Sequence, residues 1–397
     1  MDRDEERIAR NRRALKDAEI DVLVCALPMN VLLLSGYWPV VGTSLAVFTS
    51  EGKTAVIVPS DERVMADNGW ADELRILEGG SLQELKSPLA AAMIPLAEIA
   101  SATPKARIGF ESDAVSEPSS YASMNLYGST IEALVAGAFK RCTLVPAGDV
   151  LTRLRSNLTP SEIAKVKIAC AIARKAYADG REKMREGLRE TQAALAFRTR
   201  LADPGDEYGS VARADGFAFC MSGGNSYEAF AAYQRSRSRR LKIGDLALVH
   251  CNSYADGFWT DITRTFCLGE PDERTREMYD VVFKASRAAF AGIRPGVKAR
   301  AIDAAAREML NERGFGKEFV HGLGHAVGFH AIDHNAPPRL HPASPDILET
   351  GMAFNIEPAI YIEDFGGMRH CDMAVVTENG AELLTPFQSG IEQMIIH

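Results

Sequence analysis

The stretch His321-Gly322-Leu323-Gly324-His325 says most about the fold of this 397-residue chain. It is flanked by Asp261-Ile-Thr-Arg-Thr265 upstream and by Asn355-Ile-Glu-Pro358 downstream, and all eight histidines lie after residue 249. Histidine and carboxylate side chains that converge from separate segments are typical of metal-dependent hydrolases. The C-terminal half of the chain is therefore predicted to carry the chemistry.

Length and composition fit two globular domains. A chain of 397 residues exceeds the usual size of one domain, and 46% hydrophobic with 25% charged residues is ordinary. The net charge of −8 argues against general nucleic-acid binding, which needs a basic surface. We interpret the one basic run, Arg235-Ser-Arg-Ser-Arg-Arg240, as a solvated loop; a contact for an anionic substrate group or a partner subunit is the alternative.

Membrane insertion and a disulfide framework are not expected. No apolar run approaches the ~18 residues of a membrane span, and the N-terminus lacks the apolar core of a signal peptide. Seven cysteines without a paired spacing fit reduced thiols in a cytosol. We therefore expect a cytoplasmic protein.

Residues 1–156 alternate strand-like and helix-like segments, which predicts a smaller N-terminal α/β domain. A hairpin is expected between 45–48 and 54–58. The next domain should begin at residue 157, because Thr159, Pro160 and Glu162 form a capping-box pattern that opens a long helix.

Residues 157–397 predict an α+β domain with helices packed on a strongly curved antiparallel sheet. Helices are expected near 273–291 and 300–313. The strands expected there are Leu246–His250, Phe258–Phe266, Met352–Ile362 and Arg369–Thr377.

Antiparallel pairing of the first two of these strands can bring His250 and Asp261 to one face, close enough to share an ion. Cys251 should point to the opposite face, because side chains alternate along a strand. Glu357 lies in an apolar segment, where an ionised carboxylate is costly unless it is paired, protonated or bound to metal.

These segments, in this order, resemble the pita-bread hydrolases: prolidase, aminopeptidase P, methionine aminopeptidase and the metal-free relative creatinase. The landmarks are Lys242-Ile-Gly-Asp-Leu-Ala-Leu-Val249, Asp261-Ile-Thr-Arg-Thr265, His321-Gly-Leu-Gly-His325, Ile356-Glu-Pro358 and Val375-Val-Thr-Glu-Asn-Gly380. The resemblance covers nearly the whole chain. It implies a pita-bread C-terminal domain after an N-terminal domain of the creatinase and prolidase type, and a homodimer.

The family binds two divalent ions through five ligands, in the order Asp, Asp, His, Glu, Glu. The second, third and fourth fall on Asp261, His325 and Glu357. The first falls on His250 and the fifth on Cys371. Both replacements can bind metal, and imidazole and thiolate favour zinc. We expect an altered site that holds one or two ions, with zinc favoured; a pocket without metal is the alternative.

The resemblance also assigns residues around the metal site. His321 matches a histidine that contacts substrate, and Arg369 matches an arginine behind the site. A further family histidine is matched by His334 if two residues are inserted, with His330 as the competitor. The histidine that proline peptidases and creatinase carry after Ser222-Gly-Gly-Asn-Ser226 is missing here.

Other candidates are weaker. His370 should face away from the pocket, because its strand neighbour faces the pocket. His341 and His397 belong to no constellation and are expected on the surface. Tyr37 and Trp38 are interpreted either as core aromatics or as a cover for the active site of a partner subunit.

The first of three hypotheses is a metal-dependent hydrolase of a C–N bond in a small molecule or short peptide. By resemblance, an Xaa-Pro dipeptidase or aminopeptidase is the nearest named activity, and a non-peptide substrate stays open. A metal-activated water would attack the substrate, with Glu357 shuttling the proton and His321 and His334 stabilising the oxyanion.

The second hypothesis is a metal-free amide or amidine hydrolase resembling creatinase. Cys371 would be its nucleophile, with a pKa lowered by His250 or Arg369. The third is a non-catalytic binding module, which the acidic charge and the retained Asp261 and His325 make least favoured.

Overall fold

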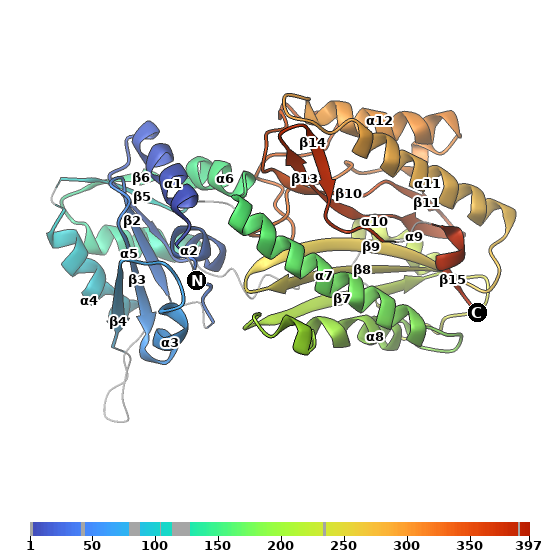
Figure 1. Cartoon of the computed structure of the whole chain (residues 1–397), viewed down its shortest axis with the longest axis horizontal. Coiled ribbons are helices and arrows are strands. Elements are labelled where there is room, and N and C mark those ends of the chain that lie inside the picture. The colour runs from blue at the N-terminus through green and yellow to red at the C-terminus, as the bar shows by residue number, and fades with distance from the viewer. Residues whose placement is uncertain are drawn as a thin grey trace. The chain divides into compact units, whose positions relative to one another are not determined.

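The computed structural model describes residues 3–40, 44–78, 88–103, 105–112, 128–232, 236–387 and 390–397. The chain divides into two compact units, Met1–Arg155 and Ser156–His397 (Figure 1). None of the helices in these ranges has the length and apolar character that crossing a membrane requires.

The first unit is built on a six-stranded sheet of order β4-β3-β2-β1-β5-β6. The predicted hairpin is confirmed, since β2 and β3 pair antiparallel, whereas β1 pairs parallel with β5. Tyr37 is buried here and its hydroxyl contacts Glu62, which favours a core role for this aromatic residue. The strands are β1 (Val22–Cys25), β2 (Leu45–Thr49), β3 (Thr54–Pro59), β4 (Glu73–Leu77), β5 (Arg107–Phe110) and β6 (Thr143–Pro146), and the helices are α1 (Glu5–Asp17), α2 (Pro28–Ser35), α3 (Arg63–Ala66), α4 (Pro88–Ser101), α5 (Gly128–Ala138) and α6 (Gly148–Ser156).

The second unit has a four-stranded sheet of order β15-β9-β8-β7, a three-stranded sheet β10-β13-β14 and a hairpin β11-β12. Its strands are β7 (Ala214–Ser222), β8 (Leu246–Ala255), β9 (Phe258–Leu268), β10 (Ala353–Ile356), β11 (Ala359–Ile362), β12 (Gly366–Arg369), β13 (Asp372–Thr377), β14 (Gly380–Leu383) and β15 (Ile395–Ile396). The helices are α7 (Pro160–Lys183), α8 (Glu190–Ala202), α9 (Gly224–Tyr227), α10 (Ala229–Ala232), α11 (Glu273–Ala291) and α12 (Ala299–Glu312). The α+β prediction is confirmed, although β15 pairs parallel with β9.

Two apolar cores lie on opposite faces of the β7-β8-β9 sheet. Val249 and Cys251 of β8 pack with Phe197 of α8 on one face. Leu248 of the same strand packs with Val281 of α11 on the other. Since alternate residues share a face, His250 lies on the side of Leu248, where α11, α12 and the shorter sheets are found (Figure 1).

Two predicted strands are each broken in two, and the breaks fall at candidate site residues. The segment expected as one strand over 352–362 forms β10 and β11, separated by Glu357 and Pro358. Proline has no N–H to donate to a ladder, so regular pairing stops there. The segment expected over 369–377 breaks in the same way around Cys371. Glu357 is therefore not within a regular strand, and its side chain is free of the alternation that a strand imposes.

The capping box that opens α7 is present as predicted. Thr159 Oγ1 accepts a hydrogen bond from the backbone N–H of Glu162, and the Glu162 carboxylate accepts one from the N–H of Thr159. We expect Thr159→Ala to cost about 1 kcal/mol of stability, and thermal denaturation would show it as a fall in Tm of roughly 2–4 °C. Thr199→Ala on the exposed face of α8 is the control; an equal loss there would refute a specific capping effect.

Candidate active site

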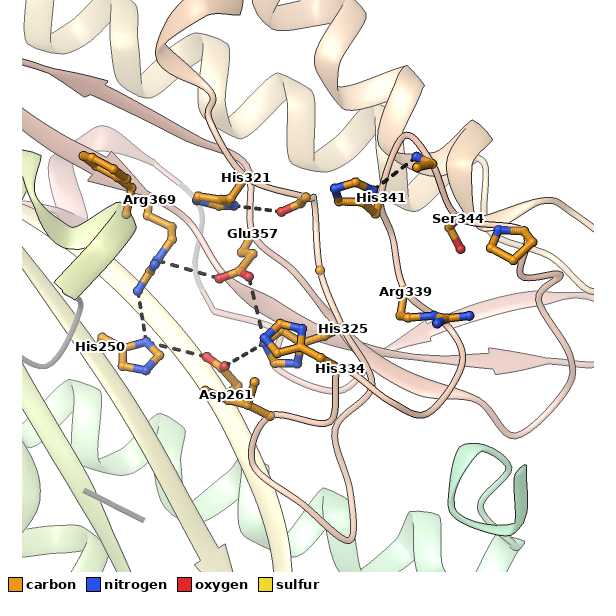
Figure 2. Close-up of a pocket in the computed structure, with 16 residues that line it drawn as sticks. His250, Asp261, His321, His325, His334, Arg339, His341, Ser344, Glu357 and Arg369 are labelled. Atoms are coloured by element: carbon orange, nitrogen blue, oxygen red, sulfur yellow. Dashed lines mark hydrogen bonds and ion pairs between the residues drawn. The ribbon is translucent and has the colours of Figure 1, made fainter. Parts of the chain in front are cut away.

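A cavity of about 380 Å³ lies in the second unit (Figure 2). Its walls come from β8, β9, the loop around the two histidines of the His-Gly-Leu-Gly-His stretch, the break after β10 and the end of β12. The sequence-predicted residues that line it are His250, Asp261, His321, His325, His334, Glu357 and Arg369. Cys371 is not among the lining residues, and neither is His330.

Five side chains form a closed circle of polar contacts at one end of the cavity, which we call the polar ring (Figure 2). In order around the ring they are His250, Asp261, His325, Glu357 and Arg369. The atom pairs are His250 Nδ1 to Asp261 Oδ1 at 3.6 Å, Asp261 Oδ2 to His325 Nε2 at 3.3 Å, His325 Nε2 to Glu357 Oε1 at 3.9 Å, Glu357 Oε2 to Arg369 Nε at 3.8 Å and Arg369 Nη2 to His250 Nδ1 at 3.1 Å. Five separate segments thus meet at this point.

The register of β8 and β9 accounts for one side of the ring. Thr263 pairs with His250 and Asp261 pairs with Asn252, so His250 and Asp261 lie diagonally on one face. Cys251 lies in the opposite core, as predicted. Burial alone would raise the pKa of Asp261, but the hydrogen bond and charge of His325 and the charge of Arg369 lower it to about 2. This carboxylate is therefore ionised at neutral pH.

His325 is held from both sides by backbone and amide groups. Its Nδ1 lies 3.1 Å from the carbonyl oxygen of Ala326, which can only accept, so Nδ1 carries a proton. Its backbone N–H donates to Oδ1 of Asn355 at 2.7 Å, and the Asn355 amide lies 3.1 Å from Nε2. Burial works against a charge on His325, but the hydrogen bond and charge of Asp261 raise its pKa. Nε2 is thereby aimed at the two carboxylates.

Glu357 is the carboxyl group of the ring best suited to exchange a proton. Burial raises its pKa to about 7, against the opposing charge of Arg369. Its backbone N–H donates to Leu323 O at 2.8 Å, which fixes the strand break against the His-Gly-Leu-Gly-His loop. A carboxyl group with a pKa near neutrality can serve as a general acid or base.

His250 and Cys371 have other partners. Burial lowers the pKa of His250 to about 4, so its ring is neutral. Sγ of Cys371 donates to the backbone oxygen of Asp261 at 3.3 Å and lies 3.6 Å from Oδ1 of that residue. Burial raises the pKa of the Cys371 thiol well above its usual value, so the group is neutral too.

The remaining predicted residues lie around the ring. The His334 ring packs edge-on against His325 with centroids 4.9 Å apart, whereas Nδ1 of His330 is engaged with the carbonyl oxygen of Ile332. Burial lowers the pKa values of His321 and His334 to about 4. His370 faces away from the cavity, as predicted, and its Nε2 lies 2.8 Å from Asp372.

Sequence reasoning missed the far end of the cavity. Arg339, His341 and Ser344 line this end. The Arg339 guanidinium forms a bidentate ion pair with the Asp346 carboxylate. His341 is exposed, as expected, but belongs to the site. No spacing signal marks these residues, because they lie in an irregular loop. Tyr361, whose hydroxyl lies 3.1 Å from His321 Nε2, was also missed.

The predicted basic run is not a free cationic patch where it is described. Arg239 pairs with Asp245, with Nη1 2.6 Å from the carboxylate, and Arg240 donates to the backbone oxygen of Gly187. Arg235 lies outside the described residues. The Arg239 charge is thus paired, whereas exposed Arg240 is held by a neutral carbonyl group and keeps its charge.

Two donor pairs of the polar ring lie at or near the spacing of metal ligands. Donor atoms in a tetrahedral site with ordinary bond lengths lie about 3.3 Å apart. Nε2 of His325 is at that distance from Asp261 and is slightly farther, 3.9 Å, from Glu357. No group of three or more histidine, cysteine or acidic side chains in the described ranges is already closed to ligand spacing. Asp261, His325 and Glu357 are the residues that would hold a metal ion here.

Comparison with known proteins covers both units. Residues 164–378 match the model of metallopeptidase family M24, and residues 7–156 match the creatinase/prolidase N-terminal domain. An Xaa-Pro dipeptidase of Pyrococcus furiosus is 34% identical to this chain over 237 residues. The aligned part is 60% of this chain and 65% of that protein, so the chain spans less than two thirds of this relative's length. An uncharacterized peptidase of Bacillus subtilis is 30% identical over 279 residues, 70% of this chain and 72% of that protein.

The fold is similar to that of solved prolidases. The crystal structure of the prolidase from Pyrococcus horikoshii OT3 matches with a TM-score of 0.76 and 25% identity, covering 97% of this chain and 99% of that one. The two-unit architecture agrees with this likeness, which covers nearly the whole of both chains. The chain belongs to metallopeptidase family M24 and has its pita-bread fold.

Proposed function

We propose that this protein is a metal-dependent hydrolase that cleaves a C–N bond in a short peptide, in the manner of Xaa-Pro dipeptidases and aminopeptidases. The observation that supports this most is the convergence of Asp261, His325 and Glu357 in one cavity. The cavity volume of about 380 Å³ suits a small ligand. The Pyrococcus furiosus relative is named an Xaa-Pro dipeptidase.

In this proposal Asp261, His325 and Glu357 hold the ion. A divalent ion there would supply Lewis-acid activation of a water molecule and of the scissile carbonyl. Glu357 would take up the proton that the attacking water loses and deliver it to the leaving nitrogen. Asp261 stays ionised and keeps His325 oriented.

His321 and His334, the two histidines beside the polar ring, have different roles in this proposal. His321 Nδ1 faces the carbonyl oxygen of Gly322, so Nδ1 carries the proton and Nε2 accepts from Tyr361. In this state His321 has no N–H left for an oxyanion. No hydrogen bond to the His334 ring occurs within the described part of the chain. We therefore assign the oxyanion contact to His334, and substrate positioning to His321 and Arg369.

A metal-free mechanism with Cys371 as nucleophile is not favoured. The reactive form of a cysteine is its thiolate, and burial raises the pKa of the Cys371 thiol well above the usual value. Its Sγ is directed at Asp261 and does not line the cavity. The substrate would have to reach a fully buried sulfur.

Metal removal is the experiment that tests the function. After chelation, release of proline from Xaa-Pro dipeptides is expected to fall to background, because no cation then activates water. Zinc, manganese or cobalt, added back separately, should restore it. Chelator already saturated with calcium is the control for effects of the chelator itself. Undiminished hydrolysis by protein shown to be free of metal would rule the proposal out.

A further inference from the structure

We propose that this site holds a single divalent ion, because a guanidinium–imidazole pair, Arg369 with His250, fills the side of the polar ring where a second ion would lie. The inference rests on the proposed metal-dependent function and adds to it the number of ions and the residues that limit it.

The lone pair of His250 is already in use. An arginine side chain can only donate hydrogen bonds, so Nδ1 of His250, 3.1 Å from Nη2 of Arg369, is the unprotonated nitrogen. Thr263 Oγ1 lies 2.9 Å from the same atom. Nε2 then carries the proton and donates to Asn252 Oδ1 at 2.8 Å. Both ring nitrogens of His250 are engaged, and its acceptor nitrogen faces a guanidinium, whereas Nε2 of His325 faces a neutral amide and two carboxylates.

Arg369 cannot easily move aside. Its guanidinium also donates to Thr263 Oγ1 from Nε at 3.2 Å and to the Tyr361 hydroxyl from Nη1 at 3.4 Å. The side chain is only 5% exposed. To ligate His250, a second ion would have to displace this network and bring two positive charges next to a buried guanidinium. Repulsion between like charges is strong where water is excluded.

Cys371 does not offset that repulsion. Its Sγ is directed at the backbone oxygen of Asp261, 3.3 Å away, as a thiol donor. The negative charges of the ring are the carboxylates of Asp261 and Glu357, and Arg369 neutralises one charge of the two. The one negative charge that remains suits a single divalent ion on the side of His325 and Glu357, opposite His250.

Ion counting tests this directly. The protein, dialysed against excess cobalt and then against metal-free buffer, is analysed by plasma mass spectrometry and by visible and near-ultraviolet absorption. We expect one cobalt per chain and no sulfur-to-cobalt charge-transfer band. His250→Asp with Cys371→Glu restores two carboxylates beside Asp261 and gives Arg369 an anionic partner; this double variant should bind two. His341→Asp with Ser344→Glu adds the same charge at the far end of the cavity and should stay at one.

Each other result is decisive. Two ions in the unaltered protein would overturn the single-ion inference, and a sulfur-to-cobalt band would refute the exclusion of Cys371 from the site. Either result would leave the proposed hydrolase intact. No bound ion in the unaltered protein would overturn the proposed function itself. A folded double variant that stays at one ion, or a control that rises to two, would refute the role given to His250 and Cys371. The two measurements on the unaltered protein stand even if the double variant fails to fold.

Discussion

Asp261→Asn is expected to lower kcat/KM for an Xaa-Pro dipeptide by about 1,000-fold. Loss of the metal site removes several kcal/mol of transition-state stabilisation, and each 1.36 kcal/mol corresponds to a tenfold change in rate. Asp261 is the member of the polar ring that contacts both histidines, with one carboxylate oxygen toward His250 and the other toward His325. Its low pKa means that the carboxylate is charged whenever the enzyme is at neutral pH. Asparagine keeps the shape and removes the charge.

Asp256→Asn is the matched control. Asp256 lies on the turn between the same two strands, and its carboxylate accepts hydrogen bonds from the backbone of Ala212 and Arg213. Its side chain is not part of the cavity wall. Steady-state kinetics and ion content are measured for both variants. Asp261→Asn with wild-type turnover and bound metal would show that chemistry occurs elsewhere.

Much of the fold follows from local sequence patterns that the structure reproduces. The capping box at Thr159 is physically local, since it involves groups three residues apart. The helix expected over 273–291 is found with those bounds for the same reason. Strand alternation predicted the opposite orientations of His250 and Cys251. Patterns that involve only residues close together in the sequence can be interpreted without knowledge of tertiary packing.

The site needed information that spacing does not contain. Motif order indicated which residues belong together, but not that Arg369 would donate to His250 or that Cys371 would be directed at a backbone carbonyl. Those contacts depend on where β12 ends and β13 begins, and the break was not predicted. Arg339 and Ser344 come from an irregular loop whose path is set by its packing against the rest of the domain. The sequence therefore predicted the candidate metal ligands more completely than it predicted the hydrogen-bond partners of those ligands.

Gly324→Ala is expected to destabilise the second unit by about 3 kcal/mol, at the upper end of ordinary overpacking. A Cβ on Gly324 would lie 2.0 Å from the backbone oxygen of Asn355 and 2.8 Å from its side-chain oxygen. The backbone oxygen cannot retreat, because Asn355 is in β10 and pairs with Met373 of β13. Thermal denaturation should show a fall in Tm of roughly 6–12 °C.

The same substitution should also damage the metal site, since the Asn355 side chain that the methyl group displaces is the one that holds His325. Gly224→Ala is the control, because nothing lies within 4 Å of the added Cβ there. Ion content separates the two effects when it is measured well below the lowered Tm. If folded Gly324→Ala protein binds metal as tightly as the unaltered protein, Asn355 does not position His325, and the glycine serves packing alone. If affinity falls with stability, then the close approach that only glycine permits is what aims His325 at Asp261.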